Sequence, residues 1–170
     1  MPSESLIRWS HRGLFALIAI ASLISLVISA VLVGYYNKHG YPSHHTHAYR
    51  DRIRILLVAS VWTMAWALIL IIGFAAMGTS AVFGLITHLV PIAISFLLFL
   101  IGVSALTGLT DKISCSKSSE TFSRCKYVKG LVVISWIDTI FIFAALIFLI
   151  TLAVIARGRY GARRSTLYLD

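Results

Sequence analysis

Charged residues are scarce in this 170-residue sequence, and acidic residues are the scarcest of them: charged side chains make up 12% of the chain, and Asp and Glu together number six. Apolar residues make up 59% of the chain. A water-soluble domain of this size cannot bury that much apolar surface. The shortage of charge therefore excludes an ordinary soluble globular protein.

Motifs of catalysis and cofactor binding are missing as well. The sequence contains no G-x-S-x-G, H-E-x-x-H or C-x-x-C motif and no glycine-rich phosphate loop. We therefore expect no enzyme and no cofactor. The weak candidates for a metal site are four histidines in one loop, which lack a cysteine and have only Asp51 as a nearby carboxylate, so that a solvated loop is the favoured interpretation. They are His39, His44, His45 and His47.

Four long apolar runs are what the sequence does contain: Leu14–Tyr36, Ile55–Met77, Ala81–Leu106 and Leu131–Ala156. Each exceeds the roughly 20 residues that a helix needs to cross a hydrocarbon core of about 30 Å. Crossing helices also satisfy their own backbone hydrogen bonds. The first run is longer than the apolar core of a cleavable signal peptide. The prediction is one all-α domain over residues 1–170, an integral membrane antiparallel four-helix bundle.

The predicted helices cover about 14–36, 55–77, 81–106 and 131–156, and a short basic tail covers 157–170. The link 78–80 is so short that the second and third helices must be neighbours. With four crossings, both termini lie on one side of the membrane. The net charge of +9 does not indicate nucleic-acid binding, because the basic residues flank the apolar runs and meet anionic lipid headgroups first. The tail residues expected to contact anionic lipid are Arg157, Arg159, Arg163 and Arg164.

Two signals for orientation disagree. The termini and the link 78–80 hold six basic residues, whereas the other two loops hold nine, which favours cytosolic loops by the positive-inside rule. Cys115 and Cys125, the two cysteines, lie ten positions apart in the third loop. Such a pair is well placed for a disulfide in an oxidising compartment, which favours cytosolic termini. Two free cytosolic thiols are the alternative.

Ionisable residues interrupt two of the apolar runs, at His88 and Asp138. We expect both to face the bundle interior, since a carboxylate in hydrocarbon costs about 2.5–3.5 kcal/mol. Counting depth from the predicted helix ends at about 1.5 Å per residue puts four hydroxyl or indole groups in the layer of Asp138. They are Ser29, Ser60, Trp62 and Thr63. Three interpretations stay open: packing between helices, a proton or ion relay, and a site for a lipid headgroup or partner helix.

A loop of pattern C-x9-C that continues as SRCKYVKGLVVISW into the fourth run, together with the short link 78–80, resembles the fungal branch of the MARVEL-domain family. The resemblance implies cytosolic termini, an outward loop with a Cys115–Cys125 disulfide, and organisation of the plasma membrane or of membrane traffic. Expected partners are membrane lipids, including sterol or anionic lipid, and other membrane proteins or further copies of the chain. The alternatives are an accessory subunit of a membrane complex and a small proton- or ion-coupled transporter using Asp138 and His88.

Overall fold

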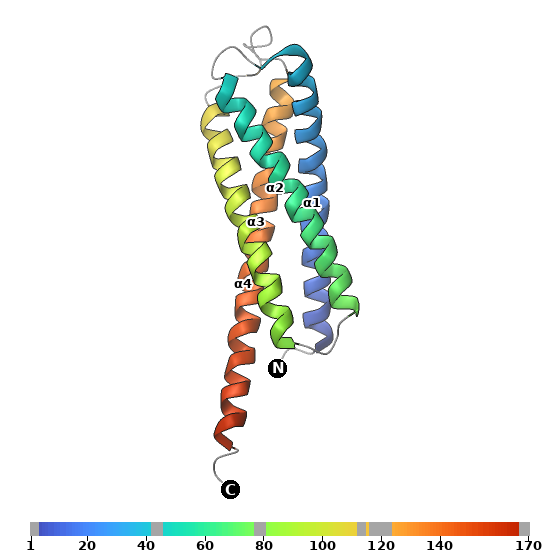
Figure 1. Ribbon diagram of the computed structural model, residues 1–170, viewed down its shortest axis with the longest axis vertical. Coiled ribbons are helices and arrows are strands. Elements are labelled where there is room, and N and C mark those ends of the chain that lie inside the picture. Colours follow the sequence, from blue (N-terminus) through green and yellow to red (C-terminus); the bar gives the residue numbers. More distant parts are fainter. Residues whose placement is uncertain (1–3, 42–45, 77–80, 112–114, 116–123, 167–170) are drawn as a thin grey trace.

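The computed structural model describes residues 4–41, 46–76, 81–111, 115 and 124–166, with side chains placed for 10, 12–41, 47–70, 72, 89–111, 115 and 124–155. Within these ranges the chain is all-helical and has no strand. The four helices are α1 (Glu4–His39), α2 (Thr46–Ala76), α3 (Ala81–Thr110) and α4 (Cys125–Thr166) (Figure 1). All four are long and apolar enough to cross a membrane, over Arg12–His39, His47–Leu70, Leu89–Thr110 and Cys125–Ile155.

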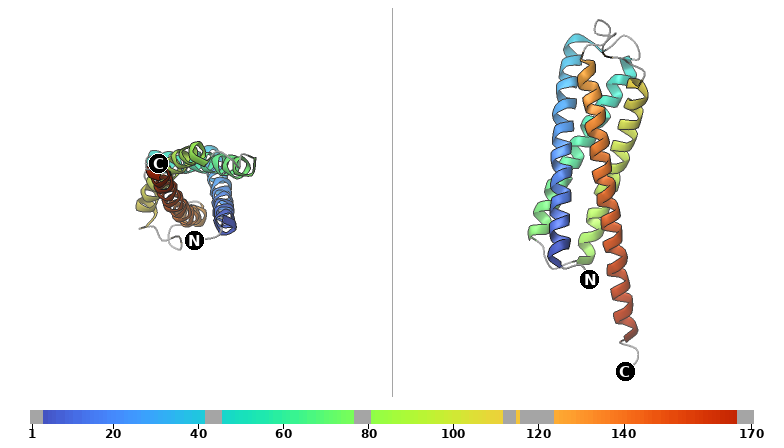
Figure 2. Two further views of the ribbon diagram at one scale, coloured as in Figure 1. Left: turned by 90° about the horizontal axis from the view of Figure 1, so that it is seen from below. Right: turned by 180° about the vertical axis from the view of Figure 1, so that it is seen from behind.

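The helices form a ring in which α1 packs against α2 and α4, and α3 packs against the same two helices. Figure 1 shows α1 and α3 rising toward one end of the molecule and α2 and α4 descending from it. The end-on view in Figure 2 shows the helices around a common centre, and the view from behind shows the last turns of α4 projecting beyond the other helices. We call the end where α1 and α3 finish the loop end.

Each helix extends beyond the apolar run that predicted it. α2 begins at Thr46 rather than near residue 55, and α4 begins at Cys125 rather than 131. α4 also continues to Thr166, so residues 157–166, expected to form a tail, belong to the helix. Residues 46–54, 125–130 and 157–166 hold seven Arg and two Lys, which have high helix propensity. The apolar runs therefore mark stretches that suit a membrane, and the helices end elsewhere.

A heptad pattern, in which buried positions alternate at spacings of three and four residues, defines the interior of the bundle. On α1 these positions are Phe15, Ile18, Ser22, Ser25, Ser29, Leu32 and Tyr36. On α4 they are Val128, Leu131, Ser135, Asp138, Ile142, Ala145 and Leu149. Such spacing keeps one stripe of each helix against its neighbours in a bundle with small crossing angles. The two stripes contain four serines and one aspartate, so the interior is polar at its middle.

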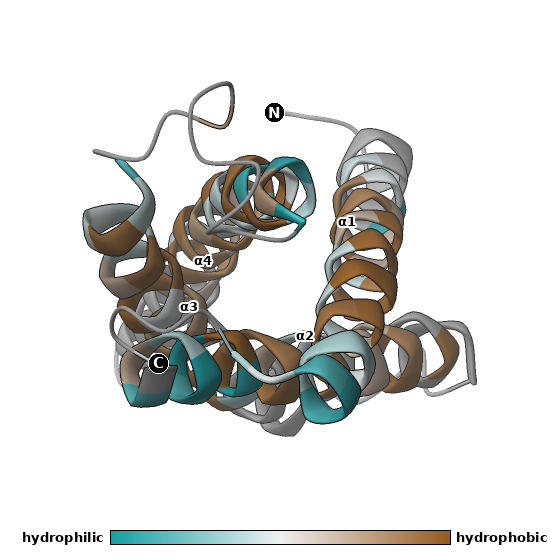
Figure 3. Cartoon of the chain, turned by 90° about the horizontal axis from the view of Figure 1, so that it is seen from above, coloured by the Kyte–Doolittle hydropathy of each residue, from teal (hydrophilic) through white to brown (hydrophobic). Residues whose placement is uncertain are grey.

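The outer surface has the opposite character. Large aliphatic side chains on all four helices are more than half exposed, including Ile20 (57%), Val58 (60%), Ile101 (58%) and Ile140 (61%). Figure 3 shows hydrophobic residues around most of each helix, with hydrophilic residues concentrated toward the helix ends. An apolar surface of this extent is not typical of a water-soluble monomer. Apolar side chains thus cover the outside, while the largely apolar interior also holds a set of polar side chains.

Close packing between α2 and α3 depends on a glycine. A Cβ atom at Gly102 would lie 2.9 Å from Cδ2 of Leu56, a fully buried side chain, and 3.3 Å from Cγ2 of Ile55. Small residues of this kind let two helices approach closely where lipid-like surroundings give no hydrophobic drive for association. Gly102 therefore fixes how near α2 and α3 can come.

Candidate functional site

The charged group inside the bundle is Asp138 on α4, whose side chain has no exposed surface. The hydroxyl of Ser22 on α1 donates a hydrogen bond of 2.6 Å to its Oδ2. Its other oxygen, Oδ1, has no hydrogen-bond partner in the part of the chain that the structure describes. Burying a carboxylate costs free energy unless it is paired or hydrogen-bonded, so Asp138 is a constrained and energetically expensive residue.

The Ser22–Asp138 contact fixes the register of the seam between α1 and α4. Because the two helices run in opposite directions, one turn toward the loop end leads from Ser22 to Ser25 and from Asp138 to Ser135. These two serines therefore lie level with each other across the seam. Near the loop end the same register is confirmed independently, because the Arg124 guanidinium lies 4.4 Å from the centre of the Tyr35 ring.

Ser22, Ser25, Ser135 and Asp138 together form what we call the polar quartet. All four side chains are fully buried, and Oγ of Ser25 and Oγ of Ser135 have no hydrogen-bond partner among the described residues. One turn further from the loop end, the same stripes present Ile18 and Ile142, both fully buried. The quartet is thus an island of oxygen atoms beside an apolar layer, where electrostatic interactions are stronger than in water.

The residues predicted to share a layer with Asp138 do not bond to it. Ser29 donates to the carbonyl of Leu26 at 3.0 Å, and Ser60 donates to the carbonyl of Leu56 at 2.7 Å, each within its own helix. The Trp62 indole nitrogen lies 3.5 Å from the Pro91 carbonyl oxygen on α3. Thr63 is buried, and its hydroxyl has no partner among the described side chains and backbone groups.

The mismatch follows from the true start of α4. Asp138 lies thirteen residues after Cys125, so it is about 20 Å along the helix rather than the 12 Å or so expected from a start at 131. The hydrogen bond places Ser22 level with it, two turns further from the loop end than Ser29. The serine stripe on α1 was visible in the sequence, but its register against α4 was not.

A second pair of buried hydroxyls lies between α2 and α3. The hydroxyl of Tyr49 donates to the Leu109 carbonyl at 2.9 Å, and Leu56 packs against Gly102 one heptad further along both helices. One more heptad in the same direction brings Thr63 level with Ser95. The Ser95 hydroxyl, like that of Thr63, is buried and finds no partner within the described ranges. Unpaired buried hydroxyls thus lie on two of the four seams, α1–α4 and α2–α3.

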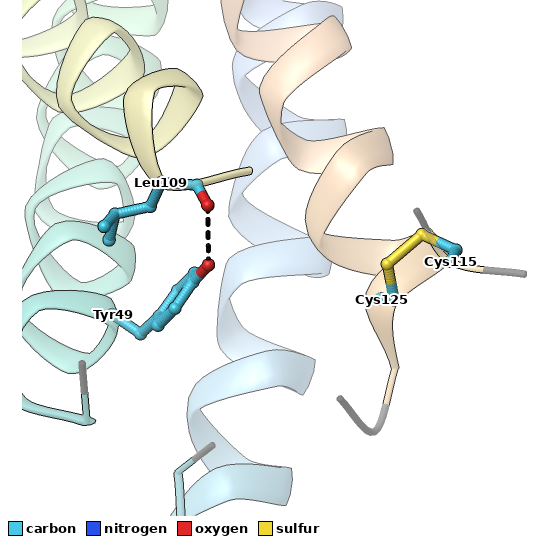
Figure 4. Close-up of a disulfide and its surroundings, with 4 residues drawn as sticks. All are labelled: Tyr49, Leu109, Cys115 and Cys125. Atoms are coloured by element: carbon cyan, nitrogen blue, oxygen red, sulfur yellow. Dashed lines mark hydrogen bonds between the residues drawn. A yellow bond between two sulfur atoms is a disulfide. The ribbon is translucent and has the colours of Figure 1, made fainter. Parts of the chain in front are cut away.

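The loop end is held together by a disulfide and by aromatic contacts. Cys115 and Cys125 are joined by a disulfide, with their Cα atoms 5.7 Å apart (Figure 4). The next residue back from α4, Arg124, has a φ of 62° and lies over the rings of Tyr35 and Tyr127. The close-up also shows the Tyr49–Leu109 hydrogen bond, which joins α2 to α3 at the same end of the molecule. α1, α2, α3 and α4 are therefore all tied at this end.

Several predicted residues take no part in the quartet or fall outside the described side chains. His39 stacks on Tyr35 with ring centres 4.4 Å apart, and His47 is exposed at the start of α2. Within the ranges that can be described, no three His, Cys, Asp or Glu side chains gather as a metal site. The predicted residues outside the described side chains are His44, His45, His88, Arg157, Arg159, Arg163 and Arg164.

Comparison of the chain with protein-family models, with curated proteins and with solved structures finds no match.

Proposed function

We propose that the chain is an integral membrane protein whose four helices cross the bilayer as an antiparallel bundle. The observation that carries this proposal is the distribution of polarity. Exposed aliphatic side chains cover the middle of all four helices, while the buried positions include the polar quartet, Thr63 and Ser95. Lipid tails solvate the outer surface without cost, and polar groups avoid hydrocarbon by facing one another.

The proposed orientation places both termini in the cytosol and the loop end outside, at the plasma membrane. The Cys115–Cys125 disulfide supports it, because disulfides persist in oxidising compartments and are rare in the cytosol. The basic residues of the loop end favour the reverse orientation by number. Two of them have structural roles instead: Arg52 donates to the Ala105 carbonyl at 2.6 Å, and Arg124 stacks on tyrosines.

Within that membrane we propose a non-enzymatic, MARVEL-like role: organising lipids and neighbouring membrane proteins through the outer faces of the helices. The loop of pattern C-x9-C and the four apolar helices support this family resemblance. The exposed faces offer a large lipid-contacting area, and the exposed rims of α4, with Val133 and Ile140, suit contact with sterol or with another helix. An accessory subunit of a larger complex would use the same faces.

A proton- or ion-coupled transporter is the second candidate, favoured by the buried carboxylate of Asp138. A continuous path would have to pass the buried apolar positions on both sides of the quartet. These are Ile18, Ile142 and Phe99 on one side and Leu32, Leu131 and Val128 on the other. Such layers favour an organising role over transport.

Reconstitution of the full chain into giant vesicles tests the proposal. We expect the protein to slow the diffusion of a fluorescent phospholipid, or to partition with sterol-rich phases, in proportion to its density in the membrane. Energy transfer between two labelled pools of the chain measures self-association in the same vesicles. Unchanged lipid diffusion and partitioning, random energy transfer, and proton or ion flux that requires Asp138 would together reject the organising role in favour of transport.

A further inference from the structure

The polar quartet offers oxygen atoms and no positive charge. Three buried serines and one buried aspartate face the α1–α4 seam at successive heptad positions, and the one described hydrogen bond among them runs from Ser22 to Asp138. The ion pair found in the described part of the chain is Arg50–Asp51, which lies near the loop end on α2. No described Lys, Arg or His side chain bonds to Asp138. An ionised Asp138 therefore lacks a neutralising partner in an apolar region.

Three buried oxygens in the quartet have no hydrogen-bond partner among the described residues: Oδ1 of Asp138, Oγ of Ser25 and Oγ of Ser135. Their side chains have no exposed surface, and the seam register places the two serines level, one turn from Asp138. Buried polar atoms in native proteins are nearly always paired, with protein groups, with water or with ions. Three unpaired oxygens on adjoining turns of one seam can therefore share a single ligand.

The chemistry of the quartet selects among such species. A water molecule could bond to the unpaired oxygens but would leave the negative charge of Asp138 in place. A proton on Asp138 would remove that charge but could be donated to one acceptor only. A divalent ion would leave an excess positive charge beside a single carboxylate. A hard monovalent cation neutralises Asp138 and accepts several oxygen ligands at once, because carboxylate and hydroxyl oxygens suit hard cations.

We propose that the polar quartet is a binding site for one sodium ion, held between α1 and α4 by Asp138 with the hydroxyls of Ser22, Ser25 and Ser135. Bound sodium would join α1 to α4 at mid-bundle, where direct contacts leave three oxygens unpaired. The site is independent of the membrane-organising role, since it concerns the interior rather than the outer faces.

The test is thermal unfolding of the purified full-length chain in detergent micelles, in sodium chloride against N-methyl-D-glucamine chloride at constant ionic strength and pH. Ligand that binds only the folded state raises Tm with concentration. We expect the wild-type Tm to rise by about 3–6 °C at high sodium, given the usual 2–4 °C per kcal/mol for chains of this length. The rise should be lost in Asp138→Asn.

Serine variants test the same site if Asp138→Asn does not fold. Ser25→Ala and Ser135→Ala each remove one oxygen ligand and should move the half-saturating sodium concentration upward by about tenfold, the factor that corresponds to 1.4 kcal/mol. Ser29→Ala is the matched control, because that hydroxyl is buried on the same stripe but bonds to its own helix. It should retain the wild-type response.

A Tm of the wild type that does not depend on sodium would overturn the proposal. A sodium response that survives in Asp138→Asn, or one that is lost equally in Ser29→Ala, would overturn it as well.

Discussion

Replacement of Ser22 by alanine removes the one described hydrogen bond that Asp138 makes. The donor–acceptor distance of 2.6 Å and the complete burial of both side chains place this bond among the strong, charge-assisted kind. Bonds to charged groups contribute about 1.5–3 kcal/mol in soluble proteins, whereas interhelical bonds in membranes average about 0.6 and reach about 1.7 kcal/mol. Because Ser22→Ala leaves a buried carboxylate without its donor, we expect a loss near the upper membrane value, about 1.5 kcal/mol.

The assay is thermal or SDS-induced unfolding of the purified chain in micelles, where such a loss corresponds to a fall in Tm of about 3–6 °C. Ser29→Ala serves as the control, since its hydroxyl bonds to the Leu26 carbonyl of the same helix and its loss should cost under about 0.5 kcal/mol. A double-mutant cycle with Asp138→Asn should give a coupling energy of about 1 kcal/mol. The reasoning is refuted if Ser22→Ala costs no more than Ser29→Ala and the cycle shows no coupling.

Three other substitutions test the packing and the ties of the loop end by the same unfolding assay. Gly102→Ala should destabilise the chain by about 1 kcal/mol net, because overpacking against Leu56 exceeds the gain in helix propensity. Gly108→Ala is the control and should stabilise the chain, because a Cβ atom at Gly108 would meet nothing within 4 Å. Equal effects of the two substitutions would contradict the close approach of α2 and α3. Replacing Cys115 and Cys125 together by serine should cost about 2.5–3 kcal/mol in the chain-entropy model and abolish the effect of a reductant on Tm. A wild-type Tm that reductant leaves unchanged would count against the disulfide. Tyr49→Phe should lower the free energy of unfolding by about 1 kcal/mol, because it removes the hydrogen bond to the Leu109 carbonyl. Tyr41→Phe should be neutral or stabilising, because the Tyr41 hydroxyl has no partner among the described residues. The reverse order of the two effects would reject this account of the loop end.

Hydropathy and the four apolar runs predicted the number of helices and their membrane-compatible length, because the solvent that a helix face meets is a property averaged over many residues. The ends of the helices were less predictable. Thr46–Arg54 and Cys125–Gly130 are polar segments that continue a helix beyond any hydrophobic signal. Helix propensity continues the helix through these segments, and a hydropathy pattern does not detect it.

The site shows the consequence of that limit. Burial of Asp138 follows from the cost of a charge in hydrocarbon, but the identity of its partner depends on how far α4 extends above it. α4 starts six residues earlier and α1 ends three residues later than predicted, so depths counted from the predicted helix ends placed Ser29 rather than Ser22 in the layer of Asp138. The heptad spacing shared by the two stripes allows either Ser22 or Ser29, one heptad apart, to lie level with Asp138, so the spacing alone does not fix the register.

Lipid exposure of the helix surfaces is the claim on which the account rests, and spin labelling measures it most directly. The native cysteines are joined to each other, so a single cysteine placed at Ile140, Val58 or Ile101 can carry a nitroxide in the reconstituted chain. We expect frequent collisions of these labels with oxygen, which concentrates in the bilayer, and few with a water-soluble nickel chelate, while a label at Asp51 near the loop end shows the opposite. Nickel collisions as frequent at Ile140, Val58 and Ile101 as at Asp51 would contradict the claim that these helix surfaces face lipid.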